Sequence, residues 1–63
     1  MYSFKWLAHA MQNRTVVQLC GADHKVYGGT ISSIAIEDGS GKNWLVTIAL
    51  TGGGVKTIFV RAE

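Results

Sequence analysis

The chain has 63 residues, a formal net charge of +2, 48% hydrophobic residues and only 16% charged residues. This length allows a single domain, residues 1–63, and so short a chain leaves much apolar surface exposed unless copies associate. The lone cysteine, Cys20, excludes an internal disulfide and fits a reducing compartment. No apolar run approaches the roughly 18 residues of a membrane span, and no signal-peptide pattern is recognisable. We therefore expect a cytoplasmic homo-oligomer that contacts no membrane.

The first expected element is a helix over about residues 3–13. Ser3 is a suitable N-cap, and Asn13 favours a left-handed residue at the helix end. Between them, apolar residues recur at spacings of three and four: Phe4, Leu7, Ala8 and Met11. A helix this short does not persist alone in water, so we expect it to pack on a sheet.

Four antiparallel strands are expected to follow the helix, because β-branched and aromatic runs alternate with turn-forming residues. These strands cover about residues 15–20, 25–37, 43–51 and 55–61. The third strand alternates most regularly and places four apolar side chains on one face: Trp44, Val46, Ile48 and Leu50. The fourth strand is apolar on both faces, which indicates that it is central or that another subunit covers it.

The second strand contains two adjacent glycines, Gly28 and Gly29. Glycine weakens a strand interior, so these residues predict a bend or the close approach of another backbone. The alternation also changes phase at Ser32 and Ser33, which predicts a β-bulge. A long strand bent in this way can belong to two sheets. We therefore expect a mainly β fold in which a strongly bent antiparallel sheet forms a small, partly open barrel.

Patterns typical of catalysis or metal binding are weak. Asp23 and His24 are adjacent in an expected turn, where neighbouring side chains diverge into water, and Cys20 has no identifiable base. The ligand spacing of a zinc site is also missing. We expect no enzyme, no metal or other cofactor, and no small-molecule substrate.

The expected topology brings three polar residues to one end of the sheet: Lys42, Asn43 and Arg61. Lys42 and Asn43 open the third strand, and Arg61 ends the fourth. An amide and a guanidinium there can hydrogen-bond to and stack on an unpaired base. The residue types alone favour a simpler interpretation, in which these groups only keep the strand ends soluble.

Four short motifs follow one another along the chain: Phe4-x-x-Leu7-Ala8, Arg14-x-Val16-Val17-x-Leu19, Val26-Tyr27-x-Gly29-Thr30-Ile31 and Ile58-Phe59-Val60-Arg61. Their order and spacing resemble the Sm-like family of Sm, Lsm and Hfq proteins over nearly the whole chain. The resemblance implies a helix followed by a small bent barrel, with Gly29 as the bend glycine. It also implies a ring of identical subunits that binds single-stranded RNA. Asn43 would then hydrogen-bond to a base, Arg61 would stack on it, and Lys42 would lie nearby.

The chain departs from this family in several places. Lys42 and Asn43 match the family's loop motif only if four residues are inserted before them. Ala62 replaces a glycine, and the given sequence ends at Glu63, where the family continues into a fifth strand. An oligomer of the same fold that has a structural or protein-interaction role, and has lost RNA binding, is therefore the second interpretation. A monomeric adaptor with a Src-homology-3-like barrel is the third.

Overall fold

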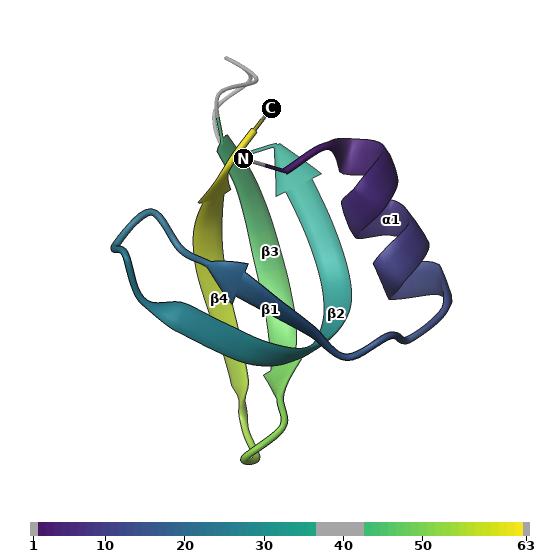
Figure 1. The fold of residues 1–63 in the computed structure, drawn as a ribbon, viewed down its shortest axis with the longest axis vertical. Coiled ribbons are helices and arrows are strands. Elements are labelled where there is room, and N and C mark those ends of the chain that lie inside the picture. Colours follow the sequence, from purple (N-terminus) through teal and green to yellow (C-terminus); the bar gives the residue numbers. More distant parts are fainter. Residues whose placement is uncertain (1, 37–42, 63) are drawn as a thin grey trace.

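The computed structural model describes residues 2–36 and 43–62, and Figure 1 shows their arrangement. These residues form one helix and four strands: α1 (Phe4–Gln12), β1 (Val17–Cys20), β2 (Val26–Ile36), β3 (Asn43–Leu50) and β4 (Val55–Arg61). The strands pair in chain order as one antiparallel sheet, β1-β2-β3-β4. The prediction of a mainly β chain with an N-terminal helix is confirmed. The sheet is open, with β1 and β4 at its edges, and it is not strongly curled.

The N-terminal end of α1 forms as predicted. The Ser3 hydroxyl accepts a hydrogen bond from the backbone N–H of Trp6 at 3.1 Å, which satisfies one of the free donors of the first turn. Leu7 and Ala10 are buried against the sheet. Phe4, which the sequence pattern placed on the same apolar stripe, is 52% exposed.

The C-terminal end of α1 differs from the prediction by one residue. Asn13 keeps a right-handed conformation with φ −88°, and Arg14 takes the left-handed one with φ 51°. Two hydrogen bonds explain the shift, because the N–H groups of Arg14 and Thr15 donate to the carbonyls of Met11 and Ala10. This pattern is a Schellman motif, which requires its left-handed residue at Arg14.

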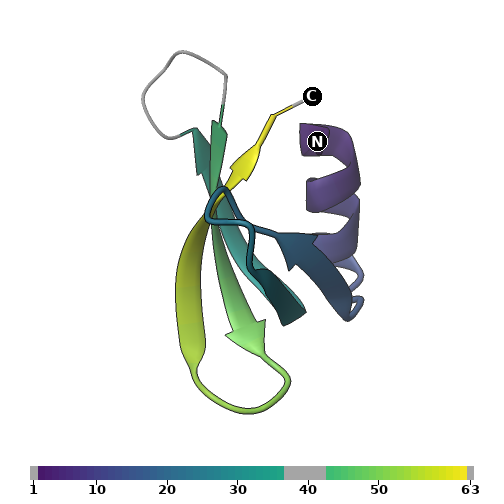
Figure 2. The ribbon, with the colours of Figure 1, turned by 60° about the vertical axis from the view of Figure 1, so that its left-hand side comes forward.

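Figure 2 shows α1 beside one face of the sheet, and the core residues pack between them. Every element contributes to it, and its buried members are Leu7, Ala10, Leu19, Ile31, Val46, Ile48, Ile58 and Val60. The alternation predicted for β3 is confirmed, because Val46 and Ile48 are fully buried and their neighbours Trp44 and Leu50 pack against the core.

The irregularity predicted in β2 lies at Ser32. The pairing of β2 with β3 shifts register between Ile31 and Ser33, and the Ser32 hydroxyl donates to the carbonyl of Thr47 at 3.1 Å. One extra residue in β2 therefore switches the face on which its apolar side chains lie. Gly29 has a separate role, because a Cβ at this position would overlap the carbonyl oxygen of Ala49 on β3.

β4 is an edge strand with two different faces. Ile58 and Val60 are buried, whereas Val55 and Phe59 on the other face are 68% and 44% exposed. The part of the chain that the structure describes provides no strand on the outer side of β4. Within the described residues, the apolar outer face that the sequence suggested is therefore partly exposed at Val55 and Phe59.

The close approach at Gly29 predicts a sharp difference between two adjacent glycines. Gly29→Ala should lower the free energy of unfolding by about 1–3 kcal/mol or more, because the β2 and β3 backbones must separate. Gly28→Ala is the matched control. A Cβ at Gly28 meets no atom closer than 3.8 Å, so its effect should stay within about 1 kcal/mol. Urea denaturation followed by circular dichroism measures both, and equal stabilities would contradict the close approach.

Candidate functional site

Asn43 and Arg61 are direct partners across β3 and β4. The Leu50 N–H donates to the Gly54 carbonyl at the hairpin end, and hydrogen-bonded and non-hydrogen-bonded pairs alternate from there. Following this alternation from Leu50 back to Asn43 places Asn43 and Arg61 in a non-hydrogen-bonded pair. Facing side chains lie closest in pairs of this type. Lys42, the third residue of the predicted group, lies outside the described residues.

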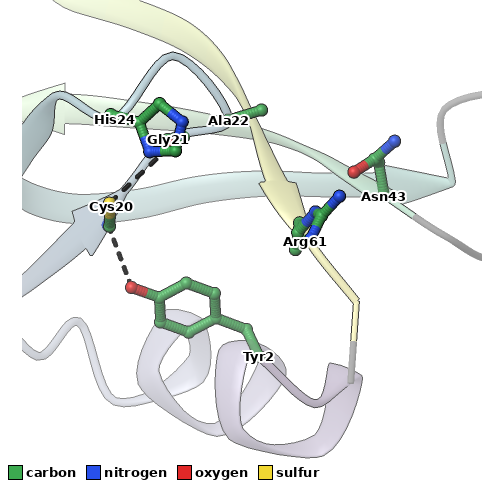
Figure 3. Close-up of a pocket in the computed structure, with 7 residues that line it drawn as sticks. All are labelled: Tyr2, Cys20, Gly21, Ala22, His24, Asn43 and Arg61. Carbon is green, nitrogen blue, oxygen red and sulfur yellow. Dashed lines mark hydrogen bonds between the residues drawn. The ribbon is translucent and has the colours of Figure 1, made fainter.

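A pocket of about 440 Å³ lies at this end of the sheet. Its lining comes from three regions of the chain: the N-terminal segment, the end of β1 with the turn that follows, and the paired ends of β3 and β4. Figure 3 shows the seven residues, which are Tyr2, Cys20, Gly21, Ala22, His24, Asn43 and Arg61. The structure therefore brings Asn43 and Arg61 into one pocket and adds five residues to them.

Tyr2 connects the N-terminal segment to three strands. Its backbone N–H donates to the Arg61 carbonyl at 2.9 Å, and its own carbonyl accepts from the Trp44 indole N–H at 3.1 Å. Its hydroxyl accepts from the backbone N–H of Cys20 at 2.9 Å. Tyr2 therefore spans the gap between the ends of β1 and β4, as Figure 3 shows.

The turn between β1 and β2 is tied to the opposite edge of the sheet. The Ala22 N–H donates to the Phe59 carbonyl of β4 at 2.7 Å. Within the turn, Gly21 N–H donates to the Lys25 carbonyl at 2.8 Å, and His24 N–H donates to the Gly21 carbonyl at 3.0 Å. His24 takes a left-handed conformation with φ 66°. These bonds place His24 at the rim of the pocket, where its side chain stays exposed.

Asp23 fixes this turn from outside the pocket. Its two carboxylate oxygens accept from the Lys25 backbone N–H at 3.1 Å and from the Tyr27 hydroxyl at 2.9 Å. Both bonds favour the charged form, so the pKa of Asp23 lies below its ordinary value of 3.8, chiefly because of the Lys25 N–H. The bond to Asp23 likewise raises the pKa of Tyr27 above 10.0.

The chemistry of the pocket suits a planar ligand that carries negative charge. Arg61 contributes a permanent positive charge, Asn43 an amide with donors and an acceptor, and Tyr2 an aromatic ring. No carboxylate is among the described residues that line the pocket. Over the same part of the chain, no three metal-binding side chains cluster, and no helix is long and apolar enough to cross a membrane.

The sequence did not assign Tyr2, Cys20 and His24 to this site. Cys20 lies at the end of β1 and His24 in an exposed turn, as the sequence predicted, and both also line the pocket. The Cys20 thiol is exposed and makes only a weak bond to the Gly21 carbonyl at 3.7 Å. The one sequence signal for His24 was its place in a Gly-Ala-Asp-His turn, which gives no information about what the turn packs against.

Comparison of the chain with protein-family models, with characterised proteins and with solved structures finds no match in any of the three.

The hydrogen bonds of Asp23 predict a pH-dependent contribution to stability. Because folding lowers the pKa of Asp23, its stabilisation is complete above about pH 4 and disappears as the carboxylate is protonated at lower pH. Asp23→Ala should therefore lower the melting temperature at pH 7, and the difference from the unmodified chain should shrink below about pH 4. Thermal melts over this pH range measure the difference in melting temperature between the two proteins. The other carboxylates are present in both proteins, so their contributions cancel in this difference. A difference that stays constant or grows in acid would contradict the assignment.

Proposed function

We propose that this chain is a ring-forming Sm-like protein that binds single-stranded RNA in the pocket at the ends of β3 and β4. The observation that carries the proposal is the direct pairing of Asn43 with Arg61 in a pocket of about 440 Å³. These are the two described residues that the resemblance to the Sm-like family selected for base contacts. The order of a short helix and a four-stranded meander is consistent with that family's fold.

The two side chains offer complementary contacts to an unpaired base. The Arg61 guanidinium is planar and exposed, so a base can stack on it, and it also attracts the phosphate backbone. The Asn43 amide can donate to and accept from a base edge. Because the chain has a net charge of +2, a ring of copies would increase the attraction for RNA.

The outer side of β4 supports association of subunits. Residues 55, 57, 59 and 61 direct their backbone groups away from β3, since they occupy non-hydrogen-bonded pairs. The carbonyls of Phe59 and Arg61 are occupied by Ala22 and Tyr2. No described residue bonds to the outward backbone groups of Val55 and Thr57. Together with the exposed side chains of Val55 and Phe59, these groups form an edge onto which another strand can add.

The same edge also favours the second candidate, a structural or protein-interaction oligomer without RNA binding. Another subunit could cover the exposed side chains of Val55 and Phe59 whether or not the pocket holds a base. RNA binding distinguishes these two candidates. Solution mass distinguishes both of them from a monomeric adaptor.

Removal of Arg61 is the direct test of the pocket. Arg61→Ala should weaken binding of uridine-rich or adenine-rich oligonucleotides about 5- to 100-fold, because one stacking contact is lost. Lys5→Ala removes the same charge from the exposed surface of α1 and should change affinity little. Filter binding at low salt measures all three proteins. Absence of binding by the unmodified chain would contradict the RNA proposal, and equal affinities of Arg61→Ala and the unmodified chain would contradict the site.

A charge on the β4 edge should weaken assembly. Phe59→Lys places a cation on the exposed apolar surface and should reduce the solution mass toward that of one chain. Val16→Lys is the control, because Val16 is 62% exposed but precedes β1. Size-exclusion chromatography with light scattering reports the masses. If the unmodified chain is a monomer, the oligomer proposal is wrong.

A further inference from the structure

We infer that Tyr2 and His24 contact the bound base, so that the N-terminal segment and the β1–β2 turn are parts of the binding site. This inference rests on the proposed RNA function and extends it to two residues that no comparison or resemblance assigns. Figure 3 shows the Tyr2 ring, the His24 ring and Arg61 around one open space. Each can present a plane to a base that has left its stack.

The Tyr2 ring is held in place before any ligand arrives. The backbone of Tyr2 is bonded to Arg61 and Trp44, and its hydroxyl accepts from Cys20, so both ends of the side chain are fixed. The Trp6 ring supports it, with ring centroids 5.7 Å apart. A ring that is already ordered loses little entropy on binding, so stacking on it contributes most of its free energy to affinity.

His24 is placed at the pocket by a strained backbone. Its φ of 66° is a conformation that glycine adopts without strain and that costs other residues about 1 kcal/mol. The turn keeps this geometry through the Asp23 carboxylate, which accepts from the Lys25 N–H, and through the bond from His24 N–H to Gly21. A planar side chain at a strained position that lines a pocket points to a role in binding.

The side chains around the pocket favour a nucleotide of a single strand over a base in a duplex. Stacking on Tyr2, His24 or Arg61 requires an exposed base face, and only unpaired nucleotides offer one. Arg61 also supplies a positive charge for the adjoining phosphate. The Asn43 amide, next to Arg61, is placed for the edge of the same base.

Three variants test the inference by binding of a short oligouridylate and a short oligoadenylate. Tyr2→Leu should weaken binding about 5- to 100-fold, and Tyr2→Phe, which keeps the ring, should recover most of this loss. His24→Gly should raise the melting temperature, because strain is relieved, and should nevertheless weaken binding. The matched control is His9→Ala, which removes an imidazole from the exposed side of α1. Its affinity should be unchanged. In the unmodified chain, a base on Tyr2 should also change tryptophan emission, because Trp6 and Trp44 both contact Tyr2.

The outcomes separate this inference from the proposed function. If the unmodified chain binds and Arg61→Ala weakens binding, but Tyr2→Leu and His24→Gly bind normally, the inference is wrong and the pocket proposal stands. If Tyr2→Leu fails to fold, His24→Gly and the tryptophan emission decide: normal affinity and unchanged emission overturn the inference. If the unmodified chain binds neither oligonucleotide, both proposals fall.

Discussion

Two hydrogen bonds to the edge of β4 hold the site together. The carbonyls of Phe59 and Arg61 point away from β3 and accept from Ala22 and Tyr2 at 2.7 and 2.9 Å. Without them, the turn after β1 would not be bonded to β4, and Tyr2 would be held only by its bonds to Trp44 and Cys20. With them, the turn after β1 and the segment before α1 meet at the end of β4, where the pocket lies. These bonds also cover part of an edge that would otherwise invite strand addition.

Much of the fold was predictable because its causes are local. The Ser3 cap, the alternation in β3 and the irregularity near Ser32 each depend on residues within a few positions of one another. The exposure of Phe4 and the left-handed Arg14 were missed, because they depend on where α1 meets the sheet and on which carbonyls remain free at its end. The strongly bent sheet and partly open barrel expected from Gly28 and Gly29 were wrong, since the sheet is not strongly curled, and local patterns fix strands but not the curvature between them.

The candidate site likewise has a part that the sequence predicted and a part that it did not. The sequence placed Asn43 and Arg61 at the same end of the sheet, and the structure makes them direct partners across β3 and β4. Tyr2 and Cys20 are 18 positions apart, and a hydrogen bond between them joins segments whose proximity no local pattern encodes. His24 is exposed in a turn, as predicted, but its place beside the pocket depends on the bond from Ala22 to β4, which no local pattern encodes. The pocket proposed for a base therefore depends on long-range contacts as much as on the family-like motifs.

Nuclear magnetic resonance mapping of a bound oligonucleotide tests the central claim most directly. As oligouridylate or oligoadenylate is added to the labelled chain, we expect the largest amide shifts at Tyr2, His24, Asn43 and Arg61. Lys5 and His9, on the exposed side of α1, should barely shift. Shifts that cluster on α1 or on Val55 and Thr57 of β4, or no shifts at all, would contradict a base pocket at the ends of β3 and β4.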